Sequence, residues 1–332
     1  MTNFNVNRRN LLATGAGAGL VSAFGLPGLS SKALADGHGM EYVFLSVVTQ
    51  VPFWVDHRNA LNDVGELLGV KTTFTGPLDF DTAAQARQLD ELIVRRPAGI
   101  MIFPGDEAAM TPGINRAVEA GIPVACLTGD VPGSARSTFF GINGFNAGRE
   151  GGELLAQAIG GKGKVILGTF PAPSVLQRVE GYKSIFAEKY PDIEVVDVVN
   201  DRADPSYAPT AYSQAIQANP DIVGIGGTDG DSGKGAAIAV NEAGRAGEIK
   251  IVAMDRNDDM LPYIEDGTIH GAVAQKSYIE AFLAVQMLHW QNTDGLNVVP
   301  DWRAAGINPL PESVDTGVMM ITKDNVAQFK QT

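Results

Sequence analysis

The segment EYVFLSVVTQVPFWVDHRNALNDVGELLG, residues 41–69, shows the unit from which this chain is built. Its first eight residues are mostly apolar and predict a buried strand. Two aromatic residues, Phe53 and Trp54, stand side by side in the turn that follows. Core packing explains one aromatic residue there but not the pair. The last fifteen residues predict a helix, because their apolar side chains fall at helical spacing: Val55, Leu61, Val64, Leu67 and Leu68.

Apolar runs and helical patterns alternate along the rest of the chain. The runs are apolar throughout, which indicates sheets covered on both faces. Connections long enough to hold a helix imply parallel strands. The sequence therefore predicts an α/β protein with two doubly wound lobes of four or five parallel strands each. The predicted strands are residues 42–48, 70–74, 98–103 and 122–127 in the first lobe, and 164–169, 194–199, 221–226, 250–255 and 269–275 in the second.

The boundary between the lobes is expected at FFGINGFNAG (139–148), which is rich in Gly and Asn. The helical pattern SYIEAFLAVQMLHW (277–290) is expected to return to the first lobe, and DTGVMMITKDNV (315–326) to form another strand and turn. We therefore expect an N-terminal lobe of residues 36–142 and about 276–313. A hinge would join it to a C-terminal lobe of residues 143–275 and about 314–332.

The first 35 residues differ in composition from the rest. Arg8 and Arg9 precede a weakly apolar, glycine-rich run, and Ala33-Leu34-Ala35 matches an A-x-A cleavage signal. This order is typical of a twin-arginine export signal cleaved after Ala35. The arginine pair favours this route over general secretion, which stays the alternative. The run is interrupted by Gly and Pro and is a poor transmembrane helix, so we expect a periplasmic protein without stable membrane insertion.

The charge balance and the absent motifs exclude several functions. Asp and Glu outnumber Lys and Arg, 38 to 25, which argues against nucleic acid or an anionic membrane as a partner. The single cysteine, Cys126, lies in an apolar run and predicts a buried thiol without a disulfide. GTDGDSGKG (227–235) departs from a phosphate loop at Thr228 and Gly235. The four histidines show no metal-ligand spacing, and we expect no enzyme activity, cofactor or metal.

Polar and aromatic residues follow the ends of several predicted strands. Open parallel sheets bind ligands beyond the carboxyl ends of their strands, so these residues are candidates for one site. Each acid alone is weak evidence, because an Asp at a strand end is often only a helix cap. The set is Phe53 and Trp54 after the first strand, Thr128 and Asp130 after the fourth, and Asp229, Asp255 and Gln275 in the second lobe.

The chain from residue 36 onward resembles the ribose-binding-like group of periplasmic sugar-binding proteins of ATP-driven importers. The resemblance rests on TQVPFW (49–54), the segment 100–124, FGINGFNAGREGG (140–152), VLQRVEGY (175–182) and VAMDRNDDMLPYIEDGTIHGAVAQ (252–275). Repressors of the LacI type share the fold but carry an N-terminal helix-turn-helix where this chain has an export signal. The resemblance implies the type I periplasmic binding protein fold.

The resemblance also implies roles for single residues. Phe53 and Trp54 match the aromatic pair that encloses the sugar, and Asp255 and Gln275 match the acid and amide that hold its hydroxyls. Asp229 stands where the family often has Asn. The chain departs from the family at Phe103, Thr128-Gly129 and Leu176, where relatives often have Asn, Asp-Arg and Arg. Asp130 and Arg178 are expected to take over some of these contacts, with Thr49, Phe103 and Thr128 as further candidates. The implied ligand is a pentose, a deoxysugar, a polyol or a related small polyhydroxylated compound.

The sequence thus predicts a monomeric solute receptor that closes around a small sugar or polyol and delivers it to an inner-membrane ABC permease. Two alternatives stay open. The same fold could serve as a sugar sensor that reports to a chemoreceptor or a histidine kinase. A periplasmic carbohydrate enzyme is the other alternative, and turnover of a bound sugar would distinguish it from a receptor.

Overall fold

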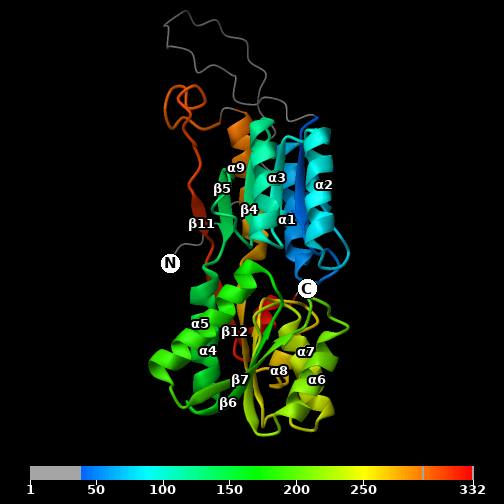
Figure 1. Cartoon of the computed structure of the whole chain (residues 1–332), viewed down its shortest axis with the longest axis vertical. Helices are drawn as coiled ribbons and strands as arrows, with labels where there is room; N and C mark the ends of the chain where they lie inside the picture. Colours follow the sequence, from blue (N-terminus) through cyan, green and yellow to red (C-terminus); the bar gives the residue numbers. More distant parts are fainter. Residues whose placement is uncertain (1–38, 294, 331–332) are drawn as a thin grey trace, which may run out of the picture. The chain divides into compact units, whose positions relative to one another are not determined.

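The computed structural model describes residues 39–293 and 295–330 (Figure 1). The export signal and the cleavage position after Ala35, both predicted from the sequence, lie outside these residues. Within them the chain forms two six-stranded sheets. We call the first sheet with its helices the N-lobe, and the second sheet with its helices the C-lobe.

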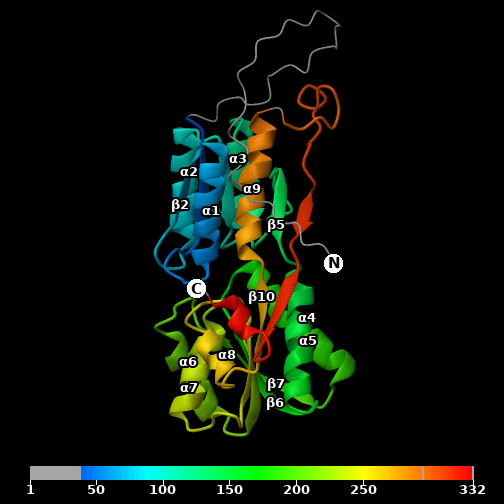
Figure 2. The same ribbon diagram turned by 180° about the vertical axis from the view of Figure 1, so that it is seen from behind.

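The sheet of the N-lobe is parallel throughout and has the order β11-β5-β4-β3-β1-β2. Alternate strand residues face opposite sides, so α1 and α9 pack on one face and α2 and α3 on the other. Figures 1 and 2 show these layers from the two sides. The elements are β1 Glu41–Ser46, α1 Trp54–Leu68, β2 Lys71–Thr75, α2 Thr82–Arg95, β3 Gly99–Phe103, α3 Glu107–Glu119, β4 Val124–Leu127, β5 Thr138–Gly141, α9 Ser277–Asn292 and β11 Ser313–Asp315.

The sheet of the C-lobe has the order β12-β10-β9-β8-β6-β7. Its first five strands in chain order are parallel, and β12 pairs with β10 in the antiparallel direction. The helices α4 and α5 cover one face, and α6, α7 and α8 cover the other. The elements are α4 Gly144–Ala158, β6 Gly163–Thr169, α5 Pro173–Lys189, β7 Ile193–Asn200, α6 Ala208–Ala218, β8 Ile222–Gly226, α7 Ser232–Glu242, β9 Lys250–Met254, α8 Leu261–Glu265, β10 Gly271–Gln275, β12 Val318–Thr322 and a short 3-10 helix, Val326–Phe329.

The predicted fold class is confirmed, but the predicted number of strands is too low. The expected boundary segment 139–148 contains the end of β5 and the start of α4. Its Gly and Asn residues predicted a loop, because these residues are typical of loops, and so neither element was expected. The strand β11 is only three residues long, which is too short to give a periodic pattern. The antiparallel direction of β12 was not expected either.

The chain passes between the sheets at three places in the described residues. It leaves the N-lobe sheet after β5, returns from β10 into α9, and leaves again between β11 and β12. Cys126 is buried in β4 as a free thiol, as predicted, and burial raises its pKa to about 12. No helix in this part of the chain is long and apolar enough to cross a membrane.

Candidate functional site

A cavity lies where the carboxyl ends of strands from both sheets meet. Side chains at or just beyond the ends of β1, β3 and β4 line it from the N-lobe, and side chains at or just beyond the ends of β6, β7, β8, β9 and β10 line it from the C-lobe. Eight residues proposed from the sequence are among its lining residues: Phe53, Trp54, Phe103, Thr128, Arg178, Asp229, Asp255 and Gln275. The structure therefore brings together residues that lie up to 222 positions apart, from 53 to 275. Their role in ligand binding stays a prediction.

The two aromatic residues after β1 have different environments. Trp54 is 1% exposed and packs edge to face against Phe44, with the ring centroids 5.4 Å apart. It also contacts Phe103, and its indole nitrogen is buried without a hydrogen-bond partner in the described residues. Phe53 is half-buried and meets the Trp54 ring edge to face at 4.8 Å. Trp54 thus belongs to both the core and the cavity wall, while Phe53 remains accessible at the wall.

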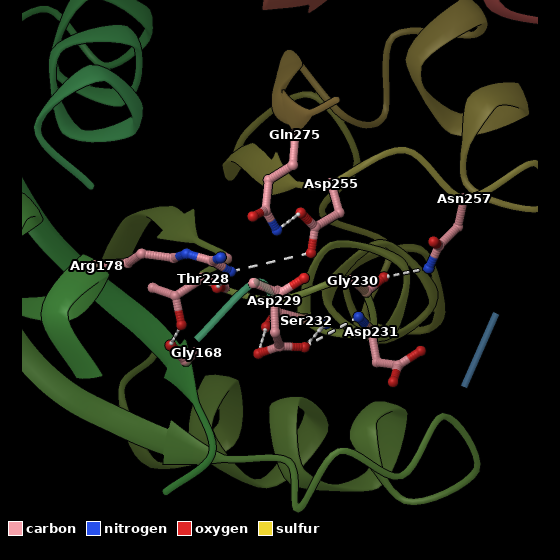
Figure 3. A network of polar contacts seen from close by, with 12 residues as sticks. Gly168, Arg178, Thr228, Asp229, Gly230, Asp231, Ser232, Asp255, Asn257 and Gln275 are labelled. Carbon is pink, nitrogen blue, oxygen red and sulfur yellow. Dashed lines mark hydrogen bonds and ion pairs between the residues drawn. The ribbon is translucent and has the colours of Figure 1, made fainter. Parts of the chain in front are cut away.

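Three polar residues of the C-lobe form a connected group in the cavity (Figure 3). The Gln275 amide donates to Asp255 Oδ1 at 2.7 Å, and Arg178 Nη1 donates to the Thr228 carbonyl at 2.8 Å. Arg178 Nη1 also lies 4.0 Å from Asp255 Oδ2. Burial raises the pKa of Asp255 to about 6, against the opposing effects of Arg178 and Gln275.

This group keeps unused hydrogen-bonding capacity. In the part of the chain that the structure describes, Arg178 Nε, Arg178 Nη2 and Gln275 Oε1 are buried and have no partner. Buried polar groups are normally paired, and each unpaired one needs an explanation. A ligand with hydroxyl groups would supply the missing partners, since a hydroxyl both donates and accepts.

Asp229 has a structural role as well as a place in the cavity wall. Its Oδ1 accepts from the backbone N–H groups of Asp231 and Ser232 at the start of α7, both at 3.0 Å. Its Oδ2 contacts the Ser232 hydroxyl (Figure 3). The same hydroxyl lies 3.1 Å from Asp201 Oδ2. Asp229 thus bonds backbone N–H groups at the start of α7, while the N-cap residue of that helix is Asp231. Burial, with the neighbouring Asp229, raises the pKa of Asp231 to about 8 and that of Asp201 well above its usual value.

Thr128 connects the cavity wall to a buried acid behind it. Its backbone is left-handed, with φ of 63°, and its hydroxyl donates to Glu280 Oε2 at 2.9 Å. Glu280 is fully buried at the start of α9 and also accepts from the Thr316 hydroxyl at 3.2 Å. His57 Nε2 lies 3.7 Å from the same carboxylate.

Two expected site residues lie outside this cavity. The Asp130 carboxylate forms a bidentate ion pair with Arg136, with Oδ2 accepting from Nη2 at 2.6 Å. The Thr49 hydroxyl donates to the Pro77 carbonyl at 2.9 Å. Asp130 was proposed because it follows a strand of the N-lobe and could replace a contact of the family, and Thr49 was a further candidate. The following turn directs each side chain to a partner elsewhere.

Several lining residues were not singled out from the sequence. Ser174, at the start of α5, has a buried hydroxyl without a partner in the described residues. It follows the end of β6, so the strand-end rule that selected Asp229 would also have found it. The others carry no polar side chain and therefore no such signal: Val48, Val51, Phe170, Val175, Ala203 and Gly230. No group of three or more acids, histidines or cysteines in residues 39–293 and 295–330 is arranged to hold a metal ion.

The family model and the similar proteins point to the same family. Residues 42–292 match the model of the periplasmic binding protein domain. The chain is similar to the xylitol-binding protein of Mycolicibacterium smegmatis, with 29% identity over 74% of this chain and 67% of that protein. It is also similar to the ribose import binding protein of Bacillus subtilis, with 24% identity over 77% of this chain and 83% of that protein.

Solved structures agree with this match. An ABC transporter solute binding protein from Burkholderia graminis, in complex with D-arabinose, is 27% identical. It superposes with a TM-score of 0.80 and covers 88% of this chain and 98% of its own. The family model spans well over half of the sequence, and the two-sheet architecture with a cavity at the strand ends agrees with it. The chain belongs to the periplasmic binding protein family.

Proposed function

We propose that this protein is a periplasmic receptor that captures a small sugar or polyol between its lobes and delivers it to an ABC permease of the inner membrane. One observation carries the proposal. Polar atoms of Arg178, Gln275 and Ser174, buried and without a partner among the described residues, share one cavity with the rings of Phe53, Trp54 and Phe103. The relatives named for xylitol and ribose, and the D-arabinose complex, support this class of ligand.

The composition of the cavity suits a polyhydroxylated ligand. A sugar presents C–H surfaces, which aromatic rings cover, and hydroxyl groups, which need partners once they leave water. Hydrogen bonds to charged groups such as Arg178 and Asp255 contribute about 1.5–3 kcal/mol each. Three or four of them with ring contacts support a Kd of about 1 µM or below, which requires about −8 kcal/mol.

Contacts between the lobes support ligand-dependent closure. Phe80 of the N-lobe packs against Phe170 of the C-lobe, with ring centroids 5.5 Å apart. Arg256, which follows β9, donates to Asp56 of α1 at 3.0 Å. A ligand that touches both walls binds the closed form better than the open form and therefore shifts the population toward closure. A permease can then distinguish the two forms.

The proposed ligand contacts are Phe53, Trp54, Arg178, Asp229, Asp255 and Gln275, with Phe103 and Thr128 in the wall. Asp130 and Thr49 stay weaker candidates, because their side chains bond elsewhere. We further propose export by the twin-arginine route with cleavage after Ala35, a monomer, and lobe boundaries near residues 142, 276 and 313. A sensory role for the same closed form is the second candidate.

Scanning calorimetry of the exported protein, with monosaccharides and polyols added one at a time, tests the proposal. We expect a melting temperature raised by at least one sugar or polyol, since a ligand stabilises the state that it binds. Phe53→Ala should weaken that binding, whereas Leu67→Ala, at an exposed position of α1, the helix that Phe53 precedes, should not. The recovered sugar should be chemically unchanged. Stabilisation only by amino acids or nucleosides would contradict the ligand class, and consumption of the sugar would indicate an enzyme.

A further inference from the structure

The wall that the N-lobe contributes to the cavity is almost entirely carbon. Its lining side chains include Val48, Val51, Phe53, Trp54 and Phe103. Phe103, at the end of β3, is 3% exposed, and its ring lies 5.2 Å from that of Trp54. The two rings leave no room between them for a polar group. This part of the wall can therefore contact a ligand only through apolar surface and the single indole N–H of Trp54.

Thr128 is the one N-lobe residue with a side-chain oxygen in the described lining. Its hydroxyl proton is already donated within the protein. The hydroxyl donates to the buried carboxylate of Glu280 at 2.9 Å and lies 3.4 Å from His57 Nε2. Both of these partners are fully buried and lie behind the wall. The left-handed backbone at Thr128 helps to hold this arrangement, because a non-glycine residue adopts it only where the surroundings fix it.

The C-lobe contributes most of the polar side chains, together with the apolar Phe170, Val175 and Ala203. Within residues 39–293 and 295–330, two nitrogen atoms of Arg178, the amide oxygen of Gln275 and the hydroxyl of Ser174 have no hydrogen-bond partner. The carboxylate of Asp255 adds acceptor capacity beside them. Most polar side chains of the cavity thus belong to the C-lobe, whereas the N-lobe wall is apolar apart from Thr128 and the Trp54 indole N–H. Figure 3 shows Arg178, Asp255 and Gln275 of the polar side.

This asymmetry limits where a ligand can carry hydroxyl groups. A hydroxyl that faces the C-lobe exchanges water for protein partners. A hydroxyl that faces Val51 or Phe103 loses water and gains no partner, which lowers affinity by about tenfold or more. An ordinary hexopyranose carries hydroxyls around its whole rim, so closure would bury at least one of them against carbon.

We infer that the ligand carries its hydroxyls along one edge and presents a carbon-only edge to the N-lobe, as does a pentopyranose at its C5 methylene or a 6-deoxyhexose at its methyl group. The inference rests on the proposed function and narrows its ligand class. Phe103 is then a residue that determines specificity by exclusion, since its apolar ring rejects a hydroxyl instead of binding one.

Titration calorimetry with pairs of sugars that differ only at this edge tests the inference. Suitable pairs are D-xylose and D-glucose, L-fucose and L-galactose, and L-rhamnose and L-mannose. In at least one pair, the member that lacks the exocyclic hydroxyl should bind about tenfold tighter or more. Phe103→Asn should bring this ratio toward one, because its amide supplies a partner. Phe103→Leu, the apolar control, should keep the ratio while lowering the affinity for both sugars.

A second variant covers the case in which Phe103→Asn does not fold. Val51→Thr adds a hydroxyl to the same wall at nearly constant volume and should also reduce the ratio. Two results overturn the inference and leave the proposed function intact. One is an unchanged ratio of the two Kd values in both folded variants. The other is equal or tighter binding of the more hydroxylated sugar in every pair. Absence of binding by any sugar or polyol overturns the proposed function and the inference with it.

Discussion

Gly148 of α4 lies directly against the backbone of Arg178 in α5. A Cβ atom on Gly148 would lie 2.1 Å from the carbonyl oxygen of Arg178, and one on Gly181 would lie 2.1 Å from that of Phe145. The two helices therefore touch backbone to backbone, which only glycine permits. This contact fixes the turn of α5 from which the Arg178 guanidinium enters the cavity.

The first prediction follows from this contact. Gly148→Ala should force α4 and α5 apart and reduce the free energy of unfolding by about 1–3 kcal/mol. It should also raise the Kd of the ligand about tenfold, because displacement of Arg178 weakens a charged hydrogen bond. Urea unfolding and calorimetry measure the two effects. Gly133→Ala is the control, since a Cβ there meets no atom within 4 Å. Equal behaviour of the two variants would show that the helix contact does not position Arg178.

The buried carboxylate of Glu280 gives a second prediction. It accepts hydrogen bonds from Thr128 in the cavity wall and from Thr316 in the segment between β11 and β12. Glu280→Ala removes both acceptors and leaves a cavity, so it should lower the free energy of unfolding by about 2–4 kcal/mol. Glu280→Gln keeps one acceptor oxygen and nearly the same volume, and its loss should be smaller. Equal losses in chemical unfolding of both variants would contradict this explanation.

The sequence predicts the fold well because its signal is local. Apolar runs located ten of the twelve strands in the described residues, while β5, β11 and the direction of β12 depend on contacts between distant segments. The cavity was equally accessible to sequence reasoning, because strand ends converge in any doubly wound sheet. The sequence could not predict which side chains point into the cavity. Asp130 and Ser174 both follow strand ends, but only Ser174 lines the cavity.

Asp255 provides a third prediction, on the pH dependence of binding. Burial raises its pKa to about 6, so the side chain is a carboxylate at pH 7.5 and protonated at pH 5. A ligand hydroxyl that donates to the carboxylate favours the charged form. Affinity should therefore fall about tenfold as the pH is lowered from 7.5 to 5. Asp255→Asn should bind weakly with little pH dependence over this range, as measured by calorimetry in matched buffers. A flat profile in the unmodified protein would exclude this contact.

A fourth prediction concerns stability and Asp231. Its pKa rises from 3.8 to about 8, mainly through burial and the nearby Asp229. The folded state then holds this proton more tightly than the unfolded chain does, so stability decreases as the pH rises from about 4 to 8. Asp231→Asn removes this penalty and should raise the melting temperature at pH 7.5 by about 2–4 °C or more. The difference should disappear near pH 4. A lower melting temperature at pH 7.5 would show that the ionised carboxylate is stabilising.

The last prediction concerns the ion pair between Asp56 and Arg256. Asp56 belongs to the N-lobe, whereas Arg256 belongs to the C-lobe and is held there by the Phe329 carbonyl at 2.7 Å and by Asp258. Opening the cleft would separate the two charges, so the pair stabilises only the closed form. Both side chains are partly exposed, at 25% for Asp56 and 14% for Arg256, so water screens their attraction.

Asp56→Asn should therefore raise the Kd of the ligand by about two- to fivefold, which corresponds to an exposed pair of about 0.5–1 kcal/mol. The difference should shrink in 1 M NaCl, where the Debye length is about 3 Å. Asp63→Asn is the matched control, because Asp63 accepts from Tyr278 at 2.6 Å entirely within the N-lobe. It should leave the Kd unchanged even if it lowers the melting temperature. If both variants weaken binding equally at low salt, the effect arises from the charge of α1 and not from closure of the lobes.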